Sequence, residues 1–249
     1  LGATTSNDPS SVFALDGVVY VGTNGASGTG MYTLDFKQDK MFRYDATDRK
    51  DTGTSRITDR NTAVTYGNAN TAYAINSALV NDVHAAIISG QTFIAVATDT
   101  DMSVIRPDAG IVYDYSHASA DDYNTLWLTP TATASASLYA LIATKGQLER
   151  WDAVNEDTAS KIGQAPHVVW DEGGVGRNGA ATGAGPALSA AAPTVQVSPS
   201  SLFVEPKTTN SDQTVYVGTN QGLTVLRDVM GDEANGSVKY YLTNYISEE

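Results

Sequence analysis

The sequence predicts an all-β protein, a β-propeller of four to six four-stranded antiparallel blades. The main sign is a block that occurs four times: an apolar strand that ends in a small residue and a threonine, then a turn, then a second strand. Further strand-like segments precede and follow these blocks, and no strong amphipathic helical pattern interrupts them. Units of four short strands, repeated at about 40 to 50 residues, are typical of propeller blades.

The strands of the predicted blades follow one another in chain order. First strands are expected at residues 11–15, 83–88, 125–128 and 201–204. Second strands, which carry the repeat, are expected at 18–24, 93–99, 138–145 and 214–220. Third strands are expected at 31–34, 102–105, 147–151 and 223–226. Fourth strands are expected in at least three blades, at 41–44, 111–115 and 238–242.

The second strands are apolar at nearly every position rather than at alternate positions. A strand has this composition when both of its faces are covered, as when a blade packs between two neighbours. The fourth strands contain more polar residues, which suits an exposed outer edge. Similar hairpins occur in β-sandwiches, but the recurring threonine and turn favour the propeller.

The four blocks are unevenly spaced. Successive marker threonines are separated by 75, 46 and 75 positions, and they are Thr23, Thr98, Thr144 and Thr219. Each long gap has room for a degenerate blade or a long insertion. Further strands are expected in these gaps at 62–66, 71–75, 167–170 and 194–197. The predicted number of blades is therefore a range.

Residues 173–193 consist mainly of small residues, since 13 of the 21 are Gly or Ala. Such a segment has little apolar side chain to bury and loses much backbone entropy on ordering, so we expect a flexible, exposed excursion. Within it, residues 174–179 satisfy the pattern G-x-G-x-x-G. A dinucleotide site would need a helix next and an acidic residue about 20 positions later. The residues that follow fit neither requirement, so a surface loop is the preferred interpretation.

The composition excludes several classes of partner. The chain has 249 residues, a formal net charge of −13, no cysteine and no cluster of Lys and Arg. Nucleic acids and anionic membranes are recognised by such clusters, so no nucleic-acid partner is expected. No segment approaches the roughly 20 apolar residues that span a bilayer, so no membrane insertion is expected. We expect residues 1–249 to form a single propeller domain. Because the first residue is Leu1 rather than Met, we also expect this chain to be cut or processed from a longer one.

Two segments resemble known blade repeats. Residues 95–105, followed by 111–115, are similar to blades of propellers in bacterial sensor ectodomains and in large structural proteins of marine tailed phages. Residues 216–226 match the same pattern, including a glycine that Asp101 replaces in the first segment. The resemblance implies a blade type and a place in a virion tail or fibre, or in another extracellular assembly. It implies no particular chemistry.

The polar residues do not form a recognisable metal or cofactor site. The three histidines, His84, His117 and His167, are far apart and form no metal-binding motif. Acidic turns occur at 45–51, 99–108 and 228–235. Their oxygen atoms suit Ca²⁺, but none has the EF-hand spacing, and Asp and Asn in turns usually cap their own backbone. No cofactor is expected, and Ca²⁺ is the only ion that these turns suggest.

No catalytic constellation is recognisable in the sequence. It contains neither the G-x-S-x-G motif of serine hydrolases nor the Asp-box of sialidases. A propeller glycosidase would need two carboxylates facing each other across a cleft. Acidic residues beside the first strands are Asp16, Asp82, Asp122 and Glu205, and nothing distinguishes them from ordinary turn residues. We therefore expect no enzyme, and the alternative is a propeller glycoside hydrolase or lyase that acts on polysaccharide.

Ring and polar side chains combine at two places that suit a carbohydrate. A ring face can stack on the apolar face of a sugar, while polar neighbours bind its hydroxyl groups. Asp121 and Asp122 precede Tyr123, which we expect to be exposed, whereas nearby Trp127 is expected in the core. The second place is Trp170 and the acids after it. The sequence therefore predicts a non-catalytic structural or recognition module, extracellular or in a virion, that binds protein subunits of an assembly or a cell-surface glycan.

Overall fold

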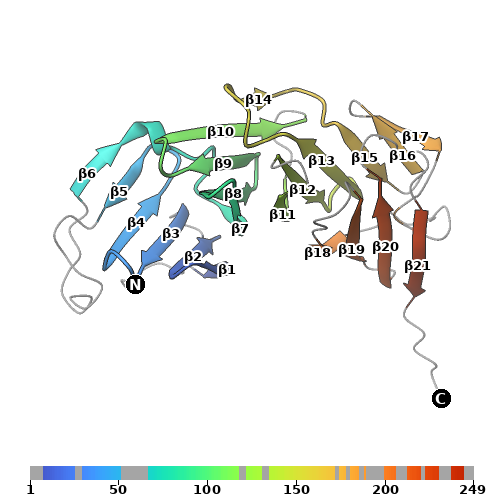
Figure 1. Cartoon of the computed structure of the whole chain (residues 1–249), viewed down its shortest axis with the longest axis horizontal. Helices are drawn as coiled ribbons and strands as arrows, with labels where there is room; N and C mark the ends of the chain where they lie inside the picture. The colour runs from blue at the N-terminus through green and yellow to red at the C-terminus, as the bar shows by residue number, and fades with distance from the viewer. Residues whose placement is uncertain are drawn as a thin grey trace, which may run out of the picture. The chain divides into compact units, whose positions relative to one another are not determined.

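The computed structural model places most of the residues that it describes in β-strands, and these strands form four sheets (Figure 1). The residues that it describes are 8–25, 30–51, 67–117, 122–130, 135–171, 174–177, 180–184, 188, 199–205, 212–219, 222–229 and 237–243. These ranges contain no α-helix, only the 3-10 helix η2 (Thr71–Tyr73), and hold no helix long and apolar enough to cross a membrane. The predicted all-β fold of repeated antiparallel, propeller-type sheets is confirmed.

The sheets belong to two compact units. Unit 1 comprises Leu1–Asp121 and Asp157–Gly163, and unit 2 comprises Asp122–Glu156 and Gln164–Glu249. Sheets A and B lie in unit 1, and sheets C and D lie in unit 2. The expectation of a single domain over residues 1–249 stays a prediction.

Unit 1 begins with the six strands of sheet A. Their order is β1-β2-β3-β4-β5-β6, with bounds Pro9–Leu15, Val18–Thr23, Gly30–Asp35, Lys40–Tyr44, Arg49–Asp51 and Gly67–Asn70. Sheet B has the order β14-β10-β9-β8-β7. In chain order its strands are β7 Val80–Ile88, β8 Gln91–Thr98, β9 Met102–Arg106, β10 Ile111–Ser116 and β14 Lys161–Ile162. The short β14 runs parallel to β10, and the other pairs in these sheets are antiparallel.

Unit 2 has two antiparallel sheets. Sheet C has the order β11-β12-β13-β15-β16-β17, with bounds Thr125–Pro130, Ala136–Ile142, Gln147–Asp152, Val168–Asp171, Gly174–Arg177 and Ala180–Ala184. Sheet D is a four-stranded meander, β18-β19-β20-β21, with bounds Pro199–Glu205, Gln213–Thr219, Gly222–Asp228 and Ser237–Thr243. Sheet D therefore has the four strands that the sequence predicts for one blade.

The threonine that marks the repeat closes the turn between the second and third strands. The hydroxyl of Thr23 donates a hydrogen bond to the carbonyl oxygen of Gly30 over 2.7 Å. Thr98 donates in the same way to the carbonyl oxygen of Asp101 over 2.7 Å. Thr219 makes the equivalent bond in sheet D. A side-chain donor is thus needed at the same place in three of the four repeats.

Sheets A and D start with the same Pro-Ser-Ser sequence and the same irregularity. The pairing of β1 with β2 shifts register between Pro9 and Ser11, and that of β18 with β19 shifts between Pro199 and Ser201. The shift brings a serine side chain onto a glycine of the second strand. A Cβ at Gly218 would lie 2.2 Å from the Ser201 hydroxyl oxygen. The glycine of the V-Y-V-G-T repeat is therefore required by close packing at a bulge.

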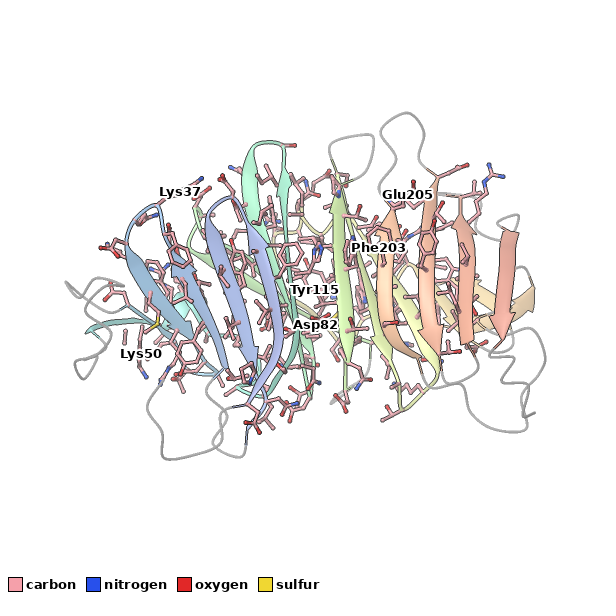
Figure 2. All side chains as sticks on the ribbon, turned by 90° about the horizontal axis from the view of Figure 1, so that it is seen from below. Lys37, Lys50, Asp82, Tyr115, Phe203 and Glu205 are labelled. Carbon is pink, nitrogen blue, oxygen red and sulfur yellow. The ribbon has the colours of Figure 1, made fainter. Side chains whose placement is uncertain are left out.

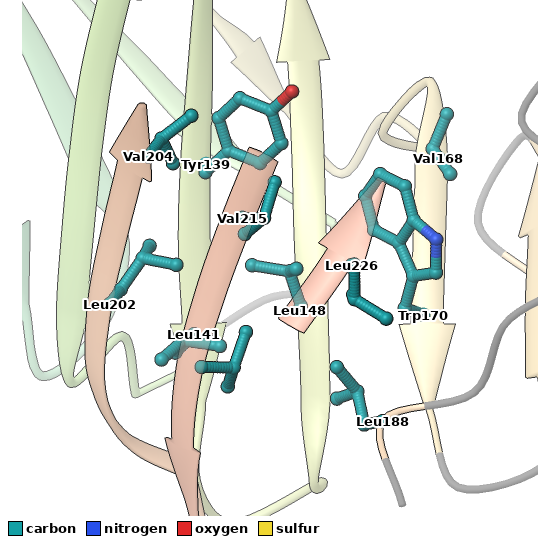
Figure 3. Packing of buried hydrophobic residues seen from close by; sticks show 11 residues of the cluster. Tyr139, Leu141, Leu148, Val168, Trp170, Leu188, Leu202, Val204, Val215 and Leu226 are labelled. Carbon is teal, nitrogen blue, oxygen red and sulfur yellow. The ribbon is translucent and has the colours of Figure 1, made fainter. Parts of the chain in front are cut away.

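Each unit has its own hydrophobic core. In unit 1, buried side chains of sheet A such as Tyr20 and Met31 pack with Ile94 and Val96 of sheet B. In unit 2, sheets C and D face each other across a cluster that includes Leu141, Leu148, Leu202, Val204, Val215 and Leu226 (Figure 3). In each unit, the two sheets pack face to face, and each sheet buries its apolar face against the other.

One expected extra strand is wrong, and another is confirmed as a strand but belongs to sheet C. Residues 71–73 form η2 rather than part of a strand at 71–75, because the Asn70 side chain accepts a hydrogen bond from the Ala72 N–H and starts a helical turn. Residues 167–170 do not start another blade. They coincide with β15, which pairs with β13 and continues sheet C. The expected strands at 62–66 and 194–197 lie outside the described residues.

The flexible excursion expected at 173–193 also needs correction. Part of it forms the hairpin β16–β17, which extends sheet C from the edge of β15. Gly and Ala contribute little apolar surface, but their N–H and C=O groups can still pair with an open strand edge. The G-x-G-x-x-G segment therefore begins with a strand of a sheet, which supports neither a dinucleotide site nor a loose surface loop there.

Candidate functional site

Unit 1 contains an open groove of about 520 Å³. Sheet A supplies most of its lining, and η2, β8 and the turn between β9 and β10 supply the rest. Its charged lining residues from sheet A and its turns are Asp16, Asp35, Lys37, Lys40, Arg49 and Asp51. Lys37 is labelled at one end of the sheet in Figure 2. The volume is in the range of roughly 300–1,000 Å³ that is usual for sites of small ligands.

The strand register explains why these residues share one face. Tyr20 on β2 is paired with Thr33 on β3, which is in turn paired with Phe42 on β4. Phe42 is paired with Asp51 on β5. Paired residues lie on the same face of a sheet, and so do residues two positions apart on one strand. Asp35 is two positions after Thr33 on β3, so Asp35 and its strand partners Val18 and Lys40 lie on the same face.

An arginine is held against two rings in the groove wall. The guanidinium carbon of Arg49 lies 3.9 Å from the ring centroid of Tyr73 and 5.0 Å from that of Phe42. Tyr73 is itself fixed, because its hydroxyl donates to the carbonyl oxygen of Pro107 over 2.7 Å. Stacking of this kind orients a planar guanidinium and limits its side-chain freedom.

Two tyrosines of the groove remain protonated over a wide pH range. Burial raises the pKa of Tyr20 to about 12, with further contributions from Tyr44 and Asp35. Burial also raises the pKa of Tyr44 to about 12, although the Arg49 guanidinium beside it acts in the opposite direction. At neutral pH both side chains are therefore neutral phenols that can donate hydrogen bonds.

Two carboxylates of the groove are already engaged by their neighbours. Asp35 Oδ1 accepts hydrogen bonds from the backbone N–H groups of Lys37 and Gln38, each over 2.9 Å. Asp16 forms an ion pair with Lys37 Nζ at 2.5 Å. The site thus combines carboxylate acceptors, phenol donors and a stacked guanidinium, which suits a polar ligand rich in hydroxyl groups.

The two rings predicted to bind a sugar are both buried, so the expectation that Tyr123 is exposed is wrong. Tyr123 is 0% exposed, and its hydroxyl donates to Glu149 Oε2 over 3.0 Å. Trp170 is 1% exposed and stacks on Tyr139 with 6.4 Å between ring centroids. Trp170 is paired with Leu148, the neighbour of Glu149 on β13, so the two rings lie on opposite faces of sheet C. The structure does not bring them together.

The sequence singled out acidic residues beside those rings or beside first strands, and those that the structure describes lie on or beside different strands. Asp121 lies outside the described residues, and Asp122 is half-buried in front of β11. Asp82 lies on β7, where its Oδ1 accepts the Val83 N–H over 2.8 Å. Glu205 is exposed at the end of β18, and Figure 2 labels both Asp82 and Glu205. Of these predicted acids that the structure describes, only Asp16 lines the groove.

No three His, Asp or Glu side chains within the described ranges are grouped so that they could hold a metal ion. In the acidic turn at Asp45, the carboxylate is bound by groups of the protein itself. Asp45 Oδ1 accepts hydrogen bonds from the N–H and hydroxyl of Thr47 and from the N–H of Asp48, and Oδ2 pairs with Arg43. Although burial would raise the pKa of Asp45, these hydrogen bonds lower it well below its usual value. This turn caps its own backbone, as expected from the sequence.

The groove was not predicted from the sequence, although the pattern of side chains on β4 could have indicated it. On β4, Lys40, Phe42 and Tyr44 occupy alternate positions and therefore one face, which is neither purely apolar nor purely polar. Among the described residues of unit 2, the ring of Phe203 is 46% exposed, and Figure 2 labels this residue. It contacts Trp127, predicted to lie in the core but half-buried here, with 4.9 Å between ring centroids.

No family model and no curated protein matches the sequence. Among solved structures, the chain is similar to a protein from Lactobacillus plantarum with 10% identity and a TM-score of 0.45, covering 98% of this chain and 73% of that one. It is also similar to an auxiliary nutrient binding protein from Bacteroides thetaiotaomicron with 7% identity and a TM-score of 0.42, covering 93% of this chain and 57% of that one. The chain therefore spans little more than half of the nutrient binding protein. Likeness at these values transfers no function.

Proposed function

We propose that this chain is a non-catalytic recognition module that binds a glycan in the groove of unit 1. The observation that carries the proposal is the composition of the groove, which places carboxylate acceptors, phenol donors and a guanidinium on one face of sheet A. Each sugar hydroxyl both donates and accepts hydrogen bonds, so a glycan needs both kinds of partner.

The state of the carboxylates supports binding without hydrolysis. A glycosidase needs one carboxyl group that stays protonated and a second one placed across the scissile bond. In the groove, Asp16 is ion-paired with Lys37, and Asp35 accepts two backbone N–H groups. Both carboxylates are thus engaged by neighbouring groups of unit 1, which suits residues that orient a ligand.

We further propose that the module is part of a virion tail or fibre, or of another extracellular assembly, and that it also contacts protein subunits there. The support is the resemblance of residues 95–105 and 216–226 to blade repeats of phage structural proteins and bacterial sensor ectodomains. A module with a net charge of −13 is also poorly suited to nucleic acid, which leaves glycan and protein as partners.

A glycan array probed with the purified chain tests the proposal, followed by a reducing-end release assay on every glycan that binds. We expect saturable binding and no release. Tyr20→Phe removes one phenol donor from the groove and should weaken binding severalfold. Tyr32→Phe is the matched control, because Tyr32 is the neighbour of Thr33 on the opposite face of β3.

Two results would contradict the proposal. If no glycan binds, the groove is not a glycan site. If reducing ends are released and Asp35→Asn or Asp16→Asn abolishes their release, the chain is a hydrolase or lyase instead of a recognition module.

A further inference from the structure

We propose that the groove of unit 1 selects a saccharide that carries a carboxylate group, such as a uronic acid residue, and that Arg49 is the residue that recognises this group. The inference rests on the proposed function, because it names the chemical class of the ligand in the same groove. Three features support it: the orientation of Arg49, the lack of an acidic partner for Arg49 among the described residues, and the neighbouring charges.

Arg49 is oriented before any ligand binds. Its guanidinium carbon lies 3.9 Å from the centroid of Tyr73 and 5.0 Å from that of Phe42. The hydroxyl of Tyr73 is anchored on Pro107, so this ring is a fixed support. A guanidinium that stacks through its flat face keeps N–H groups at its edge, and these match the two oxygens of a carboxylate. Little side-chain entropy then remains to be lost on binding.

Arg49 also differs from other arginines in its ionic partners. Arg43, Arg150 and Arg227 each form an ion pair with an aspartate. Within the described part of the chain, Arg49 has no such pair, and its polar neighbour is the Tyr44 phenol. A partly buried guanidinium without a carboxylate gains from one supplied by a ligand, because charge-assisted hydrogen bonds are the strongest of their kind.

The other charges of the groove indicate one carboxylate among hydroxyl groups rather than a dense polyanion. Asp16 is paired with Lys37, Lys40 and Arg49 add two further cations to the lining, and Asp35, Asp51 and Asp108 add three further carboxylates. Asp51 lies on the same strand face as Arg49 and can accept sugar hydroxyls, but it would repel closely spaced anions. The net charge of −13 on the chain repels a polyanion as well.

The test is a calorimetric titration with two disaccharides that differ at one carbon atom, one ending in glucuronic acid and the other in glucose. We expect the wild type to bind the acidic sugar about tenfold more tightly, as a hydrogen-bonded ion pair requires. Arg49→Met should abolish this preference. Arg49→Lys should retain part of it, because lysine keeps the positive charge but lacks the planar guanidinium that can bind both carboxylate oxygens at once. Lys50→Met is the matched control. Lys50 follows Arg49 but pairs with Asp45 and Asp48, so its loss should leave the preference unchanged.

The outcomes separate the inference from the proposed function. Equal binding of both sugars, unaffected by Arg49→Met, would overturn the inference and leave glycan binding in place. Failure of every glycan on the array would overturn both. Hydrogen exchange of sheet A in each variant reports on folding, and a preference that survives in a folded Arg49→Met protein also overturns the inference.

Discussion

Units 1 and 2 are each built from two packed sheets, yet their charged side chains lie in different surroundings. In unit 1, Arg49 and Lys40 line an open groove. In unit 2, Arg150 and Asp228 are 2% and 1% exposed and form an ion pair inside the protein. Charges that satisfy one another in the interior stabilise the fold and cannot bind a ligand, whereas charges in the groove remain available. We therefore propose that Arg150 and Asp228 in unit 2 stabilise the fold, whereas Arg49 and Lys40 in the groove of unit 1 serve recognition.

The buried charges of unit 2 form one connected network. Arg150 Nη1 donates to both carboxylate oxygens of Asp228 over 2.6 and 2.5 Å, and Arg150 also pairs with Asp152 at 2.8 Å. The Tyr139 hydroxyl donates to Asp228 over 2.5 Å. Burial and the charge of Asp228 raise the pKa of Tyr139 well above its usual value. Burial alone would lower the pKa of Arg150, but Asp228 raises it, so the arginine stays charged.

The largest expected effect is the loss of this network. Asp228→Ala leaves Arg150 with one carboxylate fewer in a dry interior, so we expect the free energy of unfolding of unit 2 to fall by about 3–5 kcal/mol. Native-state hydrogen exchange, read separately on peptides from sheets C and D and from sheets A and B, measures the change in each unit. Unit 1 should be much less affected.

A matched control is available in the same sheet. Asp212 pairs with Arg227, whose side chain is 47% exposed, at 2.5 Å. The Asp212 side chain is only 12% exposed, but Arg227 reaches water, so we expect Asp212→Ala to lower stability by about 1 kcal/mol, well below the effect of Asp228→Ala. Similar losses for the two alanine variants would contradict the view that burial makes the Arg150–Asp228 pair structurally important.

The next largest expected effect is a pH dependence of the stability of unit 1 that arises from His84. His84 in unit 1 is 6% exposed and packs on Phe13, with 4.2 Å between ring centroids. Burial lowers the pKa of His84 from 6.5 to about 4, so the unfolded chain takes up a proton first as the pH falls. Protonation of His84 therefore does not reduce the free energy of unfolding above pH 6.5, and it reduces this free energy progressively as the pH falls from 6.5 to about 4. Over that window unit 1 should lose up to about 3 kcal/mol of stability, since one pKa unit corresponds to about 1.4 kcal/mol.

His84→Leu should remove most of this pH dependence, as measured by hydrogen exchange of sheets A and B between pH 7 and pH 4. The control is His167→Leu, because the His167 side chain is exposed in unit 2. A slope that persists in the His84→Leu protein would assign the acid sensitivity of unit 1 to its carboxylates instead.

The strands of both units could be predicted because their signals are local. β2 and β19 contain the same V-Y-V-G-T sequence and take the same place beside a first strand. The threonine closes a turn within its own hairpin, and the glycine meets a serine of the adjacent strand. Each of these interactions lies within one repeat, so the repeated sequence alone indicates the repeated structure.

The sites could not be predicted in this way, because they depend on residues far apart in the sequence. Arg150 meets Asp228 across 78 positions, and Tyr73 meets Pro107 across 34. Tyr123 is the converse case. Its polar neighbours in the sequence suggest exposure, but Glu149, 26 positions later, accepts its hydroxyl, so the ring can be buried with its polar group satisfied.

The smallest expected effect concerns the ion pair at the rim of the groove. Asp16 and Lys37 are 2.5 Å apart, but each side chain is 56% exposed, so water screens this pair more than the Asp212–Arg227 pair or the Arg150–Asp228 pair of unit 2. Asp16 also has a φ of +49°, which Asn tolerates and Ala does not. We therefore expect Asp16→Asn to change the stability of unit 1 by less than about 0.5 kcal/mol, and Asp16→Ala to lower it by about 1 kcal/mol through backbone strain. Urea denaturation followed by hydrogen exchange on β1 and β2 measures both. If Asp16→Asn were as harmful as Asp228→Ala, the charges of the groove would be structural, and the division of roles between the two units would fail.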